Sequence, residues 1–290
     1  MPQFIYPVRT TKTTLQCRDI TQGTHKAFAK MLLNNDAKCL NTFIDELINE
    51  IVIGAPKDLT VIDKLLILLE ARCYSISPVL EFSKKEGKSN LNFTVNINDT
   101  INIILKQEFN KFVFNELGIY CEATLPRNFF YDDIEDIIAD SIDVLVINEE
   151  PVDINFTLDQ KRELVSKLPN TILTKFISFL ETQDKNIKDI IVVKLPKQLA
   201  EEEYNLSIYG SELLPILNLC YYLDLASIHH NEYHLIKSHG FNMEQINKTS
   251  PNELALYYKF IEEEAKKAKQ EAEAANQTQN IVPASFANQG

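Results

Sequence analysis

The sequence predicts an α+β fold that is mostly helical and carries one or two small antiparallel sheets. Apolar residues recur at helical spacing through most of the chain, whereas strict alternation is confined to short segments. One predicted helix, 60–74, is apolar almost all round. With 290 residues, 45% of them hydrophobic, the chain is long enough to bury a substantial core.

The helix at 60–74 is the most informative element. Thr60 is a suitable N-cap, and Asp63 three residues later makes a variant of the capping box. The apolar residues Val61, Ile62, Leu65, Leu66, Ile67, Leu68 and Leu69 leave hardly any polar face. We therefore predict that this helix is buried at the centre of the molecule.

The N-terminal part is predicted to combine a hairpin with helices. Residues 1–20 alternate weakly around a threonine-rich turn, which is typical of a small β-hairpin. Helical spacing follows over 24–33 and 39–51, and 81–89 reads as a charged loop. Antiparallel strands within one small sheet over 90–126 are then predicted at 91–97, 101–105, 112–114 and 119–125.

The remainder is predicted to be helical around a second strand pair. Helices are expected over 132–146, 157–169, 171–182 and 212–237, and strands over 190–195 and 204–209. Ser250, followed by Pro251 and Glu253, marks a clear helix start. We expect an N-terminal α+β domain at 1–185, a mainly helical region at 186–276 and a disordered tail at 277–290.

Charge and cysteine usage exclude several classes of partner and site. The net charge of −12 disfavours binding to nucleic acid or to an anionic membrane. The five cysteines are dispersed without a Cys-x-x-Cys pair, as expected for reduced thiols rather than disulfides or a zinc ribbon. Neither a cationic leader nor an apolar run of membrane-spanning length is found, so we expect a soluble intracellular protein.

The densest group of candidate metal ligands lies at 228–240. His230 and His234 are four residues apart on a predicted helix, with His239 or Glu232 as a third ligand. Zinc hydrolases need His-Glu-x-x-His, whereas the order here places Glu232 on another face. The alternative is that these histidines flank the end of a core helix that Gly240 terminates. We favour this alternative and predict no metal and no cofactor.

Other candidate catalytic groups have simpler interpretations. Cys17 and His25 could form a nucleophile and base, but a buried thiol beside a surface imidazole fits the sequence better. The acidic residues at 132–136 occupy the first turn of a predicted helix, where negative charge suits the helix dipole. The chain contains none of the motifs GxGxxG, P-loop or GxSxG. We therefore predict that the protein is not an enzyme.

Several segments occur in an order that resembles a known family. Tyr6-Pro7 opens a segment ending at Arg18, and 43–48 reads Phe-Ile-Asp-x-Leu-Ile. The strongest match is Leu59, Thr60, Asp63, Arg72 and Ser75, followed by Leu125-Pro126, an acidic helix at 132–143 and a helix pair at 157–180. This pattern resembles the baseplate hub subunit and hub-assembly proteins of T-even-type contractile-tailed bacteriophages. Members often carry a Cys-x-x-Cys knuckle, but 194–204 contain no cysteine, so no zinc role is carried over.

The resemblance implies a non-enzymatic late protein that acts in viral baseplate assembly through protein–protein contacts. Its implied partners are other baseplate hub or tail proteins, with the tape measure protein as one candidate. The implied locations are the host cytoplasm during assembly and the tail baseplate of the virion. One alternative is a transient tail-assembly chaperone absent from the mature virion, and a second, less favoured, is a metal-dependent enzyme using His230 and His234.

The helix that starts at Ser250 is the candidate partner-binding element. Its first turns are amphipathic, and the hypothesis assigns partner contacts to Leu254, Tyr257, Tyr258 and Ile261. The rest of the helix is a Glu/Lys/Ala run with charge pairs four residues apart. The alternative is that this run is only a solvated extension of a core helix.

Overall fold

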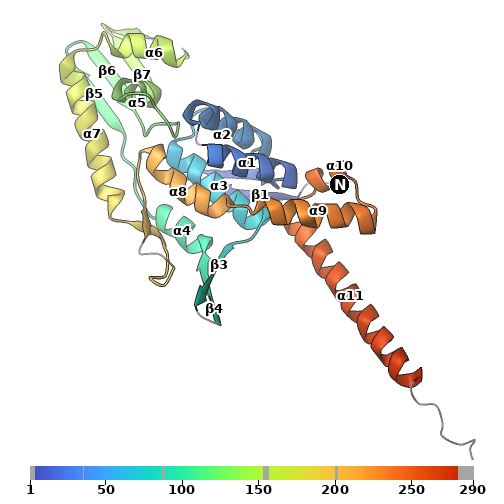
Figure 1. Cartoon of the computed structure of the whole chain (residues 1–290). Coiled ribbons are helices and arrows are strands. Elements are labelled where there is room, and N and C mark those ends of the chain that lie inside the picture. The colour runs from blue at the N-terminus through green and yellow to red at the C-terminus, as the bar shows by residue number, and fades with distance from the viewer. Residues whose placement is uncertain (1–3, 35, 87–88, 153–156, 200–201, 280–290) are drawn as a thin grey trace, which may run out of the picture.

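The computed structural model describes residues 4–34, 36–86, 89–152, 157–199 and 202–279. The predicted α+β class is confirmed, with four antiparallel sheets in this part of the chain. Figure 1 shows a central helical body, a sheet with its helices at one end, and a long helix leaving the other end. Two-stranded hairpins make up three of the sheets, and the fourth has the strand order β5-β6-β7-β8.

Along the described part of the chain, helices and strands alternate in small groups. The helices are α1 (Gln22–Asn34), α2 (Ala37–Ile51), α3 (Val61–Ser75), α4 (Ile97–Ile104), α5 (Ile134–Ser141), α6 (Leu158–Val165), α7 (Asn170–Lys188), α8 (Gly210–Tyr221), α9 (Leu225–His239), α10 (Met243–Lys248) and α11 (Pro251–Gln279). The strands are β1 (Ile5–Arg9), β2 (Thr14–Arg18), β3 (Val79–Glu86), β4 (Ser89–Asn96), β5 (Phe112–Glu116), β6 (Ile119–Ala123), β7 (Ile142–Ile147), β8 (Glu150–Pro151), β9 (Ile191–Lys194) and β10 (Glu203–Asn205).

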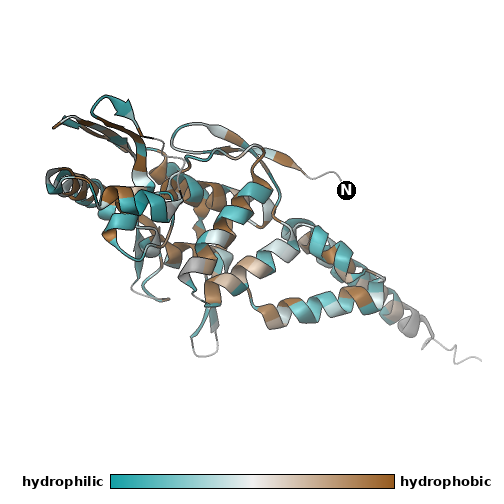
Figure 2. Ribbon diagram, turned by 90° about the horizontal axis from the view of Figure 1, so that it is seen from above, coloured by the Kyte–Doolittle hydropathy of each residue, from teal (hydrophilic) through white to brown (hydrophobic). Residues whose placement is uncertain are grey.

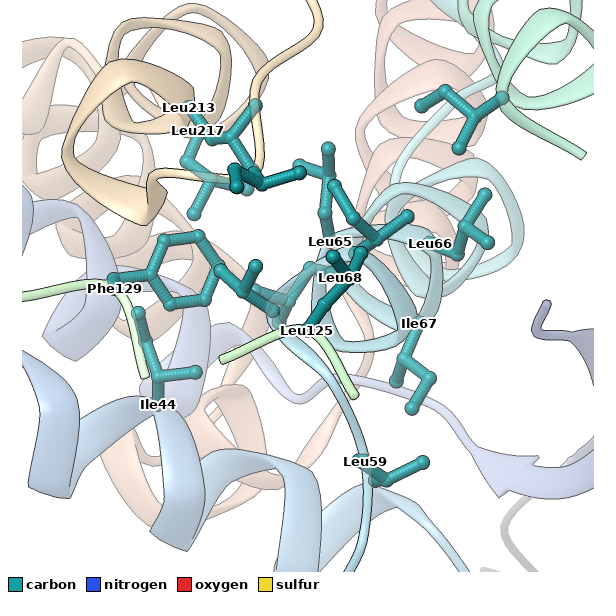
Figure 3. Packing of buried hydrophobic residues seen from close by; sticks show 14 of the residues in the cluster. Ile44, Leu59, Leu65, Leu66, Ile67, Leu68, Leu125, Phe129, Leu213 and Leu217 are labelled. Atoms are coloured by element: carbon teal, nitrogen blue, oxygen red, sulfur yellow. The ribbon is translucent and has the colours of Figure 1, made fainter. Parts of the chain in front are cut away.

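Helix α3 is the centre of the body, as its sequence predicts. The Thr60 side chain accepts a hydrogen bond from the backbone N–H of Asp63, and the Asp63 carboxylate accepts one from the backbone of Thr60. The side chains of Leu65 to Leu69 are fully buried among β1, α2, α4 and α8. Figure 3 shows several of them packed with side chains of α2, α8 and the segment after β6. Each buried leucine or isoleucine contributes about 1.5–3 kcal/mol to folding.

The polar residues of α3 are paired, which lets the helix be buried on all sides. Glu70 accepts from Arg9 Nε at 2.9 Å, and Lys64 Nζ lies 2.5 Å from Asp45. Arg72 donates to the carbonyl oxygens of Ser77 and Cys220. Buried polar groups with such partners avoid the several kcal/mol that an unpaired group would cost.

The four-stranded sheet packs one face against α7. Phe112 of β5 lies 4.7 Å, centroid to centroid, from Phe176 and 5.6 Å from Phe179. The opposite face is open to solvent at Val113 and Val144, which are both exposed. The alternation of buried and exposed residues along β5 follows the period of two expected for a half-covered sheet.

Two predicted elements between residues 81 and 105 are wrong. The charged segment 81–89 is not a loop, because 79–86 form β3, paired with β4 in a projecting hairpin. Charged side chains are tolerated there because the hairpin leaves most of its surface in solvent. The run 101–105 is not a strand, because Ile97, Ile101 and Ile104 form the buried face of α4.

Further boundaries differ from the prediction because of tertiary pairing. The helix expected over 132–146 ends at Ser141, and Ile142–Ile147 form β7 beside β6. The single sheet expected over 90–126 is divided between the β3–β4 hairpin and the four-stranded sheet. The helix expected over 212–237 is interrupted between α8 and α9, and β10 is shorter than the strand expected at 204–209.

The other predicted elements are present, including the N-terminal hairpin and the capping box at Thr157 and Gln160, but α6 ends at Val165, before the predicted residue 169, and α7 extends to Lys188, beyond the predicted residue 182. Of the predicted tail at 277–290, residues 280–290 lie outside the described residues, and α11 ends at Gln279. The domain division at 185/186 stays a prediction. The main hydrophobic core contains residues from both sides of it, from Tyr6 to Tyr221.

We expect a pH-dependent stability that depends on His25. Burial, with a further effect of nearby Arg72, lowers the pKa of His25 from 6.5 to about 4. The unfolded chain therefore binds more protons than the folded chain between these values, so the free energy of unfolding falls as pH drops from 6.5 to 4, by up to about 3 kcal/mol. Urea unfolding across this range should show a reduced slope for His25→Gln, and the slope should be unchanged for exposed His239→Gln. Equal slopes in His25→Gln and the unsubstituted chain would contradict the assignment.

Candidate functional site: the C-terminal arm

Helices α9, α10 and α11 form one structural unit, here called the C-terminal arm (Figure 1). Asp224 begins α9 by accepting hydrogen bonds from the two backbone N–H groups at the helix start, and Gly240 ends it with a φ of 73°. Asn242 and Gln245 form a capping box at α10. Ser250 Oγ accepts from the backbone N–H of the third residue of α11. Local capping therefore fixes where each helix of the arm begins.

The arm has a small hydrophobic cluster of its own. Its buried members are Leu235 of α9, Ile246 of α10 and Leu254 of α11. The half-buried Phe241, Tyr257, Tyr258 and Ile261 pack against them. All four residues of the partner-binding hypothesis thus contact this cluster, and Leu254 is only 2% exposed. Their first role is to seat α11 on α9 and α10.

A buried ion pair joins the arm to the body. Lys26 Nζ of α1 lies 2.7 Å from Glu232 Oε1 of α9, and the two side chains are 10% and 1% exposed. The backbone N–H of Gln22 also donates to the carbonyl oxygen of Thr249, at 2.8 Å. The first helix of the body therefore contacts the α9–α10 segment at two points, the middle of α9 and the residue that follows α10.

The outward side of α11 carries two large apolar side chains. Leu256 and Phe260 are 52% and 56% exposed, and they are four residues apart, so they lie on one face of the helix. Beyond them, residues 262–274 are all exposed, and the helix projects away from the body (Figure 1). Figure 2 shows hydrophobic and hydrophilic residues alternating along the helices at this end of the molecule. The spacing of Leu256 and Phe260 can be read from the sequence. That the opposite face of α11 is covered by α9 and α10 cannot.

The histidines of the arm do not assemble a metal centre. His230 Nε2 and His234 Nε2 are 3.2 Å apart on the exposed side of α9, whereas Glu232 points to Lys26. Across the described ranges, no group of three or more His, Cys, Asp or Glu side chains is placed to hold a metal ion. His239 lies in the last turn of α9, just before Gly240.

The remaining candidate groups have structural roles. Burial raises the pKa of the Cys17 thiol to about 12, so it is protonated at neutral pH and is a poor nucleophile. The predicted surface position of the His25 imidazole is wrong, because the side chain is 3% exposed and lies edge-on to Tyr221, with ring centroids 5.7 Å apart. Asp133 caps α5 by accepting from the backbone N–H of Asp136 at 3.0 Å, and its carboxylate pairs with Arg162.

Comparison with known families shows to which family the chain belongs. The family described as T4 bacteriophage base plate protein matches residues 1–208, which is well over half of the chain. The chain belongs to this family. It is a structural protein of a phage baseplate, and its partners are other baseplate or tail proteins. No curated protein matches the chain, and no solved structure does either.

The family match covers the N-terminal part of this baseplate protein, residues 1–208. It contains the N-terminal hairpin, α3 and the four-stranded sheet, and it ends two residues before α8. The C-terminal arm lies beyond the match. None of the helices in the described ranges is both long enough and apolar enough to cross a membrane.

Proposed function

We propose that this baseplate protein is a non-enzymatic subunit of the baseplate hub that binds a neighbouring hub or tail protein through α11. Family membership supports the baseplate setting. The observation that carries the proposal is the pair Leu256 and Phe260, which are more than half exposed at the base of a projecting helix. Large exposed apolar side chains beside charged residues are typical of protein-binding surfaces.

The arm presents this surface in a fixed direction. Leu254, Tyr257, Tyr258 and Ile261 hold the first turns of α11 against α9 and α10. A partner that binds these turns does not have to order them, so less of the interaction energy is lost on association. We propose that the four residues contribute to partner binding in this indirect way, together with direct contacts from the half-exposed tyrosines.

A transient tail-assembly chaperone is the second candidate. The observation that favours it is the exposed and highly charged surface of α11 from Glu262 to Glu273. Charged surfaces increase association rates and support reversible binding more than permanent attachment. The tape measure protein is then one candidate for the bound partner. Nothing in the described part of the chain favours a metal-dependent enzyme.

The proposal predicts a loss of partner binding in the variant Leu256→Ser/Phe260→Ser. Each side chain at the centre of an interface contributes roughly 1–2 kcal/mol, so recovery of baseplate proteins should fall at least about tenfold. The measurement is affinity purification of the tagged full-length chain from infected cells, with the recovered proteins quantified by mass spectrometry.

The matched control is Glu263→Gln/Lys267→Gln, which changes exposed residues of the same helix without removing apolar surface. Recovery should then equal that of the unsubstituted chain. Undiminished recovery in the Leu256→Ser/Phe260→Ser variant would overturn the assignment of α11.

A further inference from the structure

The β3–β4 hairpin projects from the body as a two-stranded sheet of its own (Figure 1). Each strand has eight residues, which extend over about 27 Å. Near the root of the hairpin Leu80 is buried, and the half-buried Phe82 and Val95 pack against the main core. In the described part of the chain each strand pairs only with the other, so both keep a long outer edge.

The hydrogen-bond pattern of the hairpin identifies the backbone groups on the outer edge of β4. Pro78 and Ile97 are the next opposite pair beyond the two strands, and the Ile97 N–H donates to the Pro78 carbonyl oxygen at 2.9 Å. In an antiparallel pair, bonded and non-bonded positions alternate. The backbone N–H and C=O groups of Asn90, Asn92 and Thr94 therefore point away from β3. These three residues are exposed, and within the described ranges their outward backbone groups have no hydrogen-bond partner.

The two edges of the hairpin differ in charge. β4 has no charged residue, no proline and no glycine, whereas β3 carries four charged side chains, those of Glu81, Lys84, Lys85 and Glu86. Charged side chains, proline and very short strands are the usual means of keeping a free edge from pairing with another chain. Among the other edge strands, β1 contains Pro7 and β8 has only two residues. The edge of β4 is thus long and unprotected, and the edge of β3 is protected.

The side chains of β4 alternate in a pattern that suits pairing with a copy of the same strand. Leu91, Phe93 and Val95 are half-buried on one face, and the intervening polar residues are exposed on the other. If two β4 strands pair antiparallel about Asn92, Leu91 of each copy lies opposite Phe93 of the other, on the same face. No charged residue faces another across this pairing. β4 therefore supplies the complementary strand that its own edge requires.

We propose that two copies of this chain pair through the outer edges of their β4 strands and form a four-stranded sheet of order β3-β4-β4-β3. The contact is isologous, with its two-fold axis at Asn92. Antiparallel pairing places the tip of each hairpin beside the root of the other, so the two bodies lie at opposite ends of the sheet. The charged β3 strands become the outer edges, which limits the assembly to two copies. The surface shares no residue with the proposed binding surface of α11.

Sedimentation velocity of the purified full-length chain over about 1–100 μM should show a concentration-dependent change from one copy to two. Asn92→Pro removes an outward N–H and should raise the dissociation constant of the dimer at least about tenfold. The matched control is Ser83→Pro, because Ser83 lies directly opposite Asn92 and its N–H points to the outer edge of β3. This control should change the dissociation constant by no more than about twofold.

Asn92→Lys is a second variant, which keeps the backbone N–H. It should also weaken the dimer, because two like charges would face each other at the two-fold axis. Circular dichroism of each variant establishes that the chain is folded. Equal dissociation constants for Asn92→Pro, Asn92→Lys and Ser83→Pro would overturn the proposal.

A chain that remains a single copy at all these concentrations would also overturn the proposal. If recovery of other baseplate proteins then fell in Asn92→Pro, the edge would belong to a strand of another protein. Assemblies of more than two copies would contradict the role of the charged β3 strands as outer edges. The Leu256→Ser/Phe260→Ser variant should leave the dimer intact, so this proposal and the proposed role of α11 fail separately.

Discussion

Replacement of Gly210 by alanine is expected to lower the free energy of unfolding by about 3 kcal/mol or more. A Cβ atom at this position would lie 2.2 Å from the Cα of Phe129 and 2.7 Å from its carbonyl oxygen. These are backbone atoms, so no rotation of a side chain can relieve the clash. Phe129 is itself 2% exposed and is packed in the core near Leu213 and Leu217 (Figure 3).

The measurement is equilibrium unfolding in urea, monitored by circular dichroism. Ser211→Ala, at the adjacent exposed position, is the matched control and should change the free energy by no more than about 0.5 kcal/mol. A Gly210→Ala protein as stable as the control would show that α8 does not approach the segment after β6 as closely as described.

Replacement of Lys26 by methionine is expected to destabilise the protein by about 3–5 kcal/mol. The change leaves Glu232, whose side chain is 1% exposed, without its lysine partner, and His229 Nδ1, 3.3 Å from Glu232 Oε2, can balance the charge only when it is protonated. Because this ion pair joins α1 to α9, the loss should be concentrated at the attachment of the C-terminal arm. Hydrogen exchange of the backbone amides should therefore increase in α9 and α10 more than in α3.

Two further variants separate the ion pair from general effects on α1. Lys30→Met lies one turn later on the exposed side of the same helix and should change stability little. Lys26→Met/Glu232→Leu removes both charges and should recover most of the lost stability. Failure of the double variant to recover more than Lys26→Met alone would contradict a role for the unpaired charge.

Local sequence signals are sufficient to predict α3, the helix at the centre of the fold. The capping box at Thr60 and Asp63 and the apolar run after it depend on neighbours along the chain, so α3 could be predicted within a residue of its bounds. The same holds for Ser250, whose hydroxyl caps α11. An element with clear capping residues and a single hydrophobic periodicity can be predicted without knowledge of the rest of the molecule.

Tertiary pairing decided the elements that were wrongly predicted. Ile142–Ile147 continue the helical spacing of α5, but β6 offers a partner strand that takes them into the sheet. The segment 79–86 carries charges typical of a loop, yet its pairing with β4 makes it a strand. Such outcomes depend on segments that meet only after folding, so the local pattern could not decide them.

The binding surface of α11 and the attachment of the arm to the body could be predicted only in part, because both depend on segments that meet only after folding. The amphipathic start of α11 was identified, but which of its faces meets the arm depends on α9 and α10. Lys26 and Glu232 are 206 residues apart, so their pairing could not be expected from either local sequence.

Quantitative mass spectrometry of purified mature virions, compared with lysate from late infection, tests the central claim most directly. A hub subunit should be present at a small, fixed number of copies per particle, in constant ratio to other baseplate proteins. Abundance in the lysate together with absence from virions would contradict a permanent structural role and would support the transient assembly chaperone.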